Sequence, residues 1–272
     1  MAIDLDAYFL RIGYSGDRTP TLGTLRTINR LHPQAIPFEN LNALMKWPVG
    51  LDAESLQQKL VRDGRGGYCY EHNLLFSHVL KALGFQVKEL SGRAVWNQPE
   101  NALTARTHVV LMVELDGEDY VVDVGYGVAT MTAPLRLETD VEQTTPHEPW
   151  QIIKRGDDFV VKMKMGDKWV ALYRFDLQEQ FLSDFELMNW YTSTHPKSLF
   201  VNNLMVARAD GNCRHSLLNN IVTARYLDGA TERRAIQSAA DLRKTLKEVF
   251  HLGLPEAQEL DMVLNRVVLP SG

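Results

Sequence analysis

The spacing of apolar side chains in the first third of the chain is helical. After Pro20-Thr21, apolar residues recur on one helical face at Leu22, Leu25, Ile28 and Leu31. A second helix is predicted from Asp52, a good capping residue, to about Arg62. A third covers residues 69–83, where the apolar side chains share one face and Gly84 provides a stop signal. Residues 1 to about 84 are therefore predicted to be helical.

The hydrophobic pattern changes after residue 84 to the shorter period typical of strands. Six strands are predicted, at residues 87–93, 109–115, 120–124, 151–154, 159–165 and 169–175. Turn signals separate several of them, namely Asp116-Gly117, Gly156-Asp157-Asp158 and Gly166-Asp167-Lys168. Turns of this kind join antiparallel neighbours, so we expect an antiparallel sheet or barrel here.

The last part of the chain mixes both patterns. A helix is predicted over residues 183–194, before Pro196, and strands are predicted at 200–207 and 221–226. Ser238 is placed to cap a helix to about residue 250, and Pro255 to open a final one. No repeat, low-complexity tract or flexible linker separates the regions, so we expect them to pack as one body.

Composition limits the class of protein. The chain has 272 residues, of which 45% are hydrophobic, enough for a sizeable core. Its net charge is −5, so it lacks the basic surface expected of a nucleic-acid-binding protein. Two cysteines suit a reducing compartment, the N-terminus lacks the basic residues of a signal peptide, and no apolar run approaches the roughly 20 residues of a membrane span. We expect a soluble cytoplasmic protein that binds neither nucleic acid nor membrane.

The segment Arg65-Gly66-Gly67-Tyr68-Cys69 carries the first chemical signal. The two glycines permit a sharp turn, and the predicted helix begins directly after it, so Cys69 is expected at a helix N-terminus. Unpaired N–H groups and the helix dipole favour a thiolate there, and the same N–H groups could hold an oxyanion. The alternative is a buried, unreactive cysteine, and the glycines alone do not decide between the two interpretations.

His108 and Asp123 are the candidate base and its orienting acid. If Asp116-Gly117 is a two-residue turn, the hairpin register puts His108 opposite Gly125. Asp123 then lies on the same face, diagonal to His108, at a Cα separation of about 7–8 Å that long side chains bridge. A three-residue turn would put the two on opposite faces. The alternative for each residue alone is structural: a satisfied or exposed histidine, and an acid at a turn or strand edge.

A metal site is the competing explanation for the cysteine segment. Cys69 and His72 have Cys-x-x-His spacing, and His78 is near. Structural zinc needs four ligands, usually in matched pairs, and the second cysteine, Cys213, has only His215 beside it. No metal is therefore predicted.

At these residues the chain resembles the arylamine N-acetyltransferases. The matching segments are Ile36-Pro37-Phe38-Glu39-Asn40-Leu41, Arg65-Gly66-Gly67-Tyr68-Cys69, Arg106-Thr107-His108, Asp123-Val124-Gly125-Tyr126-Gly127 and Thr132-Ala133-Pro134-Leu135-Arg136. They span roughly the first half of the chain, and together they are highly specific. The C-terminal part matches more loosely, through Ser198-Leu199-Phe200. Family members often carry Phe where this chain has Tyr70 and Tyr126.

The resemblance implies an α+β fold with a cysteine-protease-like core. Residues 1–84 would form a helical domain, 85–192 a β-barrel and 193–272 an α/β lid. The implied enzyme uses a Cys69–His108–Asp123 triad and a ping-pong mechanism, with acetyl-CoA as co-substrate and no permanently bound cofactor. Its acceptors would be arylamines, arylhydrazines and N-hydroxyarylamines. The oligomeric state does not follow from the sequence.

The resemblance also implies the substrate-binding residues. Phe38, Tyr126 and Phe200 would line the aromatic pocket, and Trp96 and Thr107 would lie near the acyl donor. Glu39 and Arg65 would pair close to the active site. Two other functions fit the triad residues alone: a cysteine hydrolase, which passes the acyl group to water, and a non-catalytic binding module.

Overall fold

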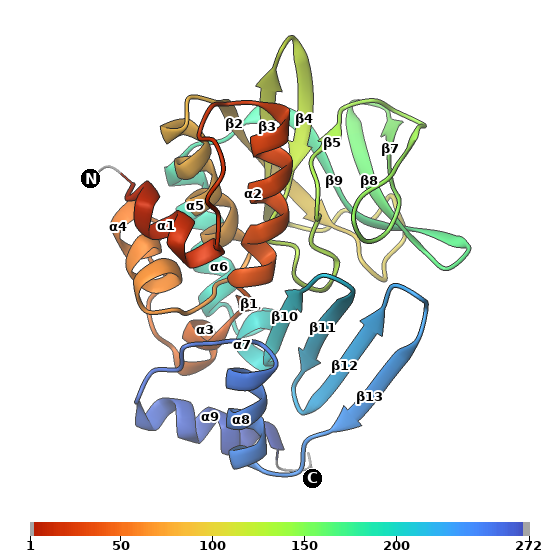
Figure 1. The fold of residues 1–272 in the computed structure, drawn as a ribbon. Coiled ribbons are helices and arrows are strands. Elements are labelled where there is room, and N and C mark those ends of the chain that lie inside the picture. Colours follow the sequence, from red (N-terminus) through yellow and green to blue (C-terminus); the bar gives the residue numbers. More distant parts are fainter. Residues whose placement is uncertain (1–2, 269–272) are drawn as a thin grey trace.

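Figure 1 shows the computed structural model, which describes residues 3–268, as three neighbouring groups of elements. Helices of the N-terminal part of the chain (red to orange) lie on one side. A large antiparallel sheet (mainly green) lies next to them, and a second sheet with α8 and α9 (blue) lies below both. The candidate site residues come from all three groups.

The N-terminal part is largely helical, as predicted. Its helices are α1 (Leu5–Ile12), α2 (Leu22–Ala35), α3 (Leu41–Met45), α4 (Ala53–Leu56), the π-helical continuation η1 (Gln57–Arg62) and α5 (Cys69–Ala82). The predicted start signals cap the helices: the Thr21 and Asp52 side chains accept hydrogen bonds from the backbone amides of Thr24 and Ser55. Gly84, left-handed with a φ of +92°, follows the end of α5.

One short strand within this region corrects the all-helical prediction. β1 (Phe38–Glu39) pairs antiparallel with β10 (Met205–Ala209), which puts Phe38 opposite Ala207. Pro37 explains the break, because a residue before proline is disfavoured in the helical conformation, and Ile36 is extended. The N-terminal part therefore supplies the edge strand of the C-terminal sheet.

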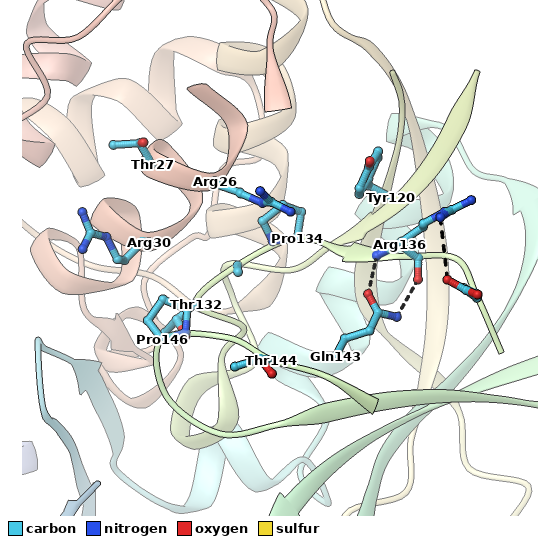
Figure 2. A pocket seen from close by; sticks show the side chains of 12 residues that line it. Arg26, Thr27, Arg30, Tyr120, Thr132, Pro134, Arg136, Gln143, Thr144 and Pro146 are labelled. Atoms are coloured by element: carbon cyan, nitrogen blue, oxygen red, sulfur yellow. Dashed lines mark hydrogen bonds and ion pairs between the residues drawn. The ribbon is translucent and has the colours of Figure 1, made fainter. Parts of the chain in front are cut away.

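The middle of the chain forms an eight-stranded sheet in the order β5-β4-β3-β2-β9-β8-β7-β6. Its strands are β2 (Gln86–Ala94), β3 (Arg106–Leu115), β4 (Glu118–Val122), β5 (Leu135–Arg136), β6 (Glu142–Gln143), β7 (Trp150–Arg155), β8 (Asp158–Met165) and β9 (Lys168–Glu179). All six predicted strands are present. The Gln143 side chain joins the two edge strands through 2.8 Å hydrogen bonds to the amide and carbonyl of Arg136 (Figure 2). The sheet is nearly closed, which confirms the predicted fold class.

The β3–β4 hairpin has the predicted two-residue turn. Asp116 and Gly117 have φ values of +54° and +78°, as a type I′ turn requires. Leu115 pairs with Glu118, which gives the predicted register.

The ladder between these strands is shorter than predicted. It ends at Val122, so the expected pairing of His108 with Gly125 does not form. The chain leaves the sheet there to pass over α5: a Cβ on Gly125 would lie only 3.0 Å from the Cα of Cys69. On its other side His108 pairs with Gly92 of β2.

The C-terminal part contains α6 (Leu182–Thr194), α7 (Leu199–Asn202), β10, β11 (Cys213–Leu218), β12 (Ile221–Tyr226), β13 (Thr231–Ala235), α8 (Ala239–Glu248) and α9 (Gln258–Val268). The strand predicted at 200–207 is wrong in its first half: Ser198 accepts the Phe200 amide at 3.3 Å and starts α7 instead. The last helix begins at Gln258, three residues after Pro255.

The division of the chain into domains at 1–84, 85–192 and 193–272 stays a prediction. Within residues 3–268, none of the helices combines the length and apolarity needed to cross a membrane.

Candidate active site

Cys69 is the first residue of α5, where the sequence predicted it. Tyr68 before it is extended and precedes the first helical turn. The Glu71 carboxylate accepts the Tyr68 amide at 3.1 Å and so caps the helix start. Cys69 is 4% exposed, and its thiol donates to the Thr107 carbonyl at 3.5 Å. The helix N-terminus favours an anion at this position.

Close backbone approach explains two glycines around the cysteine. A Cβ on Gly66 would lie 1.9 Å from the Pro37 carbonyl oxygen, a distance that no side chain tolerates. A Cβ on Gly125 would lie 2.9 Å from the Cβ of His72 and 3.0 Å from the Cα of Cys69. The cysteine turn, the segment before β1 and the loop after β4 are thus pressed together at the start of α5.

His108 on β3 and Asp123 just after β4 lie side by side and are fully buried. The imidazole Nε2 is 2.7 Å from Asp123 Oδ2. Cys69 lies close enough to the ring to contribute to the raised pKa of His108. Burial alone would lower the pKa of His108, but the charge of Asp123, its hydrogen bond and Cys69 raise it from 6.5 to about 10. The imidazole is therefore protonated at neutral pH.

A buried polar network holds Asp123 in place. Its Oδ1 accepts hydrogen bonds from Asn73 Nδ2 and the Gly125 amide, each at 2.9 Å. Asn73 also donates to the Val109 carbonyl and accepts the Val124 amide, both at 2.9 Å. Burial raises the pKa of the Asp123 carboxyl, but His108 and these donors outweigh it and leave the pKa below its ordinary value. Asp123 is a carboxylate.

Two tyrosines enclose the His108 ring. Tyr126 meets it edge-on, with ring centroids 5.0 Å apart and an interplanar angle of 86°. Tyr173 of β9 lies at 4.7 Å and 50°. The Tyr126 hydroxyl donates to the Leu172 carbonyl at 2.6 Å, and burial followed by the charge of Asp123 raises the pKa of Tyr173 well above 10. Both hydroxyls stay neutral, and the rings restrict the imidazole to one orientation.

Phe38 and Phe200, two of the predicted pocket residues, lie together. Their ring centroids are 6.1 Å apart, and Tyr68 meets Phe200 edge-on at 5.5 Å. These rings belong to β1, α7 and the residue before Cys69, so they form an aromatic cluster beside the cysteine. Tyr126, the third predicted pocket residue, contacts His108 instead, although a Cβ on the neighbouring Gly127 would touch the Phe38 ring at 3.4 Å.

The two residues predicted near the acyl donor lie in different surroundings. Thr107 is the extra residue of a β-bulge between β2 and β3, because Gly92 pairs with His108 and Arg93 with Arg106. The bulge aims the Thr107 carbonyl at the Cys69 thiol. Trp96 follows β2 and packs, partly buried, against the barrel core. The donor roles of both residues stay predictions.

Glu39 and Arg65 form the predicted ion pair. The Arg65 guanidinium donates to Glu39 Oε1 at 2.6 and 3.0 Å, and both side chains are buried. Burial raises the pKa of the Glu39 carboxyl, but Arg65 and Lys59 lower it below its ordinary value. Lys59 also binds Glu71, the capping residue of α5, at 2.6 Å. The pair fixes the backbone on both sides of the cysteine turn.

Three structural features of the site were not predicted from the sequence: Asn73, Tyr173 and the bulge at Thr107. Asn73 follows Cys69 by four residues on α5, and this i,i+4 spacing puts both on one helix face. The sequence therefore contained a signal for Asn73 in this spacing. Tyr173 comes from a strand more than 60 residues after His108, so no local pattern identifies it.

A pocket lies away from the triad, between α2 and the segment around β5 and β6 (Figure 2). It measures about 610 Å³ and is lined by Arg26, Thr27, Arg30, Tyr120, Thr132, Ala133, Pro134, Arg136, Glu138, Gln143, Thr144 and Pro146. Part of the Thr132–Arg136 family segment therefore lines it. Arg136 turns to Glu118, which it binds through two 2.8 Å hydrogen bonds. None of the predicted catalytic or substrate-binding residues lines this pocket.

Known proteins resemble this chain over nearly its whole length. Residues 21–259 match a family model described as N-acetyltransferase. An arylamine N-acetyltransferase of Mycolicibacterium smegmatis is 43% identical over 266 residues, which cover 96% of each chain. One from Escherichia coli K12 is 40% identical over 255 residues, covering 93% of this chain and 90% of that protein. The structure of Mycobacterium marinum arylamine N-acetyltransferase in complex with CoA is 42% identical, with a TM-score of 0.93 and coverage of 98% and 100%.

Proposed function

This chain belongs to the arylamine N-acetyltransferase family, and from that premise we propose that it transfers acetyl from acetyl-CoA to aromatic amines through a thioester on Cys69. The 2.7 Å hydrogen bond between His108 and Asp123, beside a cysteine at a helix N-terminus, carries the proposal. The M. marinum relative solved with CoA supports acetyl-CoA as the donor. The relatives' shared name supports arylamines as acceptors.

In the first half-reaction the Cys69 thiolate attacks the acetyl carbonyl of acetyl-CoA. The carbonyl oxygen becomes an oxyanion, which N–H groups at the start of α5 are suited to stabilise. The new C–S bond forms, the bond to CoA breaks, and the protonated His108 gives its proton to the leaving CoA thiolate. One thioester replaces another, so this step is nearly balanced in free energy.

In the second half-reaction a neutral aromatic amine attacks the acetyl-Cys69 carbonyl. His108, now neutral, accepts the proton that the nitrogen loses, and Cys69 leaves as the thiolate. The product is the acetylated amine, and the Cys69 thiolate and the protonated His108 of the starting enzyme are restored. Asp123 fixes the ring so that Nδ1 faces the sulfur, and its charge stabilises the imidazolium at both ends of the cycle.

The substrate pocket is part of the same proposal. Phe38, Phe200 and Tyr126 take the aromatic ring of an arylamine, arylhydrazine or N-hydroxyarylamine, because stacked and edge-on ring contacts favour flat apolar groups. Trp96 and Thr107 lie next to the acyl donor, acetyl-CoA. The Tyr126 hydroxyl donates to Leu172, so this tyrosine presents its ring rather than its hydroxyl to the substrate.

Initial-rate kinetics with acetyl-CoA and 4-methoxyaniline test the proposal. Parallel double-reciprocal lines are expected, because acetyl-CoA and the amine bind to different forms of the enzyme. Intersecting lines would indicate direct transfer in a ternary complex and would remove the covalent role of Cys69. Hydrolysis of acetyl-CoA at a rate that the amine does not change would identify a cysteine hydrolase instead.

A further inference from the structure

Three buried side chains from three helices form a continuous hydrogen-bonded chain behind the nucleophile. The Tyr8 hydroxyl on α1 is 2.8 Å from His32 Nδ1 on α2. His32 Nε2 is 2.8 Å from His72 Nδ1 on α5. His72 Nε2 is 3.2 Å from the carbonyl oxygen of Pro37. Each of the three side chains is at most 1% exposed. We call this set the Tyr8–His32–His72 chain.

The donor and the acceptor of every hydrogen bond in this chain follow from the group at its end, the Pro37 carbonyl. A carbonyl oxygen only accepts, so His72 Nε2 must carry a hydrogen. Burial lowers the pKa of His72 to about 4, which leaves the ring neutral and its Nδ1 an acceptor. His32 must then donate from Nε2, and its Nδ1 accepts from the Tyr8 hydroxyl. Burial lowers the pKa of His32 as well, in agreement with a second neutral ring.

The chain ends where the cysteine turn and the aromatic pocket meet. The Pro37 carbonyl is held between His72 and Gly66, where a Cβ would lie 1.9 Å from the oxygen. Phe38, the next residue, lies nearly parallel to the His72 ring, at 9° and 6.3 Å between centroids. His72 itself stands one helical turn after Cys69. The hydrogen bond to Pro37 therefore fixes the distance between Phe38 and the nucleophile.

We propose that Tyr8, His32 and His72 are positioning residues that hold Phe38 against the nucleophile helix and so set the affinity for the aromatic acceptor. The inference rests on the proposed function, in which Phe38 contacts the amine. No hydrogen bond joins any of these three side chains to the triad: the ring nitrogens of His72 are engaged by His32 and Pro37. Attack on acetyl-CoA does not use Phe38, so the two half-reactions respond differently when the chain is broken.

Tyr8→Phe is the mildest test, since it removes one hydroxyl and leaves the ring. The KM for 4-methoxyaniline should rise by about five- to tenfold, the range that loss of one buried hydrogen bond corresponds to. The rate of Cys69 acetylation by acetyl-CoA should stay unchanged. Tyr70→Phe is the matched control, because Tyr70 is equally buried but its hydroxyl makes only a 3.5 Å contact with Thr192.

His72 provides a rescue test. A glutamine has an amide NH2 group that can donate to Pro37 and a carbonyl oxygen that can accept from His32, whereas leucine has neither. His72→Gln should keep the KM for the amine near that of the wild type, and His72→Leu should raise it more than Tyr8→Phe does. An equal KM in Tyr8→Phe and Tyr70→Phe would overturn the inference. So would a parallel fall in the acetylation rate, which would indicate a general structural role.

NMR of the histidine side chains tests the chain without any turnover. Nitrogen-15 shifts should identify both His32 and His72 as neutral Nε2–H tautomers at neutral pH. An Nδ1–H tautomer or a charged ring at either position would contradict the directions derived above. If the protein formed no acetyl-Cys69 at all, the proposed function would fail, yet the tautomers would still report on the chain.

Discussion

Cys69 and Cys213 are both buried residues, at 4% and 2% exposure, and each lies near a histidine and an aspartate. Cys213 on β11 is 4.0 Å from His215 Nδ1, and His215 Nε2 is 3.1 Å from Asp210. The difference is electrostatic. Burial and then the charge of Asp210 raise the pKa of Cys213, which keeps it a thiol. Cys69 has a helix N-terminus and a protonated His108 beside it.

Brief treatment with iodoacetamide at neutral pH should therefore modify Cys69 and spare Cys213. The thiolate is the reactive form, and only Cys69 has surroundings that favour it. Peptide mapping by mass spectrometry locates the adduct, and Cys213→Ser should be labelled at the wild-type rate. Equal labelling of both cysteines would remove the evidence for an activated nucleophile.

The His108–Asp123 pair also predicts how stability depends on pH. The pKa of His108 is raised from 6.5 to about 10, so its contribution is complete below pH 6.5 and is lost as the pH rises through 10. The pKa of Asp123 is lowered from 3.8, so its contribution is present above 3.8 and is lost in acid. The stabilising effect of the pair is therefore greatest between pH 3.8 and pH 6.5.

Asp123→Asn removes this effect and provides the measurement. The difference in free energy of unfolding between wild type and variant should be largest near pH 5.5 and should shrink as the pH rises toward 10. Urea unfolding at several pH values measures it. A difference that stays constant or grows from pH 6.5 to 10 would show that His108 is not protonated in the folded protein.

At the scale of elements, local signals predicted much of this fold. The Asp116-Gly117 turn fixed the β3–β4 register, and Gly84 marked the end of α5. β1 was missed because it has two residues, and its partner Ala207 lies far along the chain. Such a strand exists only through tertiary pairing, which propensity does not report.

The candidate site shows the same limit. A hairpin signal placed His108 beside Asp123, and a glycine turn placed Cys69 at a helix start, both local features; the family resemblance joined the three as a triad. It did not identify Tyr173, which reaches His108 only because β9 and β3 flank β2 in the barrel. The Tyr8–His32–His72 chain depends on how three helices pack, and single histidines in a helical pattern give no sign of it.

The approach of the Pro37 carbonyl to Gly66 predicts a strong effect of one methyl group. Gly66→Ala should destabilise the protein by about 1–3 kcal/mol and impair Cys69 acetylation, because the backbone of the cysteine turn must move. Gly211→Ala is the control, since nothing lies within 4 Å of its added Cβ. Thermal unfolding and the acetylation rate measure both effects. Equal stability of the two variants would contradict the close approach.

At the scale of the whole molecule, the site depends on parts that are far apart in the sequence. The proposed nucleophile comes from the helical part, and the base and acid come from the barrel. Phe200 comes from the C-terminal part. Asn40 ties the first and last parts together: it donates to the Phe200 and Asn203 carbonyls at 2.7 Å and accepts the Met205 amide at 2.8 Å. One buried apolar cluster spans all three parts.

The most direct test of the covalent mechanism is the intact mass of the protein after incubation with acetyl-CoA alone. One acetyl group should be added, and peptide mapping should place it on Cys69 in both the wild type and Cys213→Ser. Addition of 4-methoxyaniline should then restore the original mass and release an equal amount of acetylated amine. A protein that acetylates the amine while Cys69 never carries an acetyl group would contradict the mechanism.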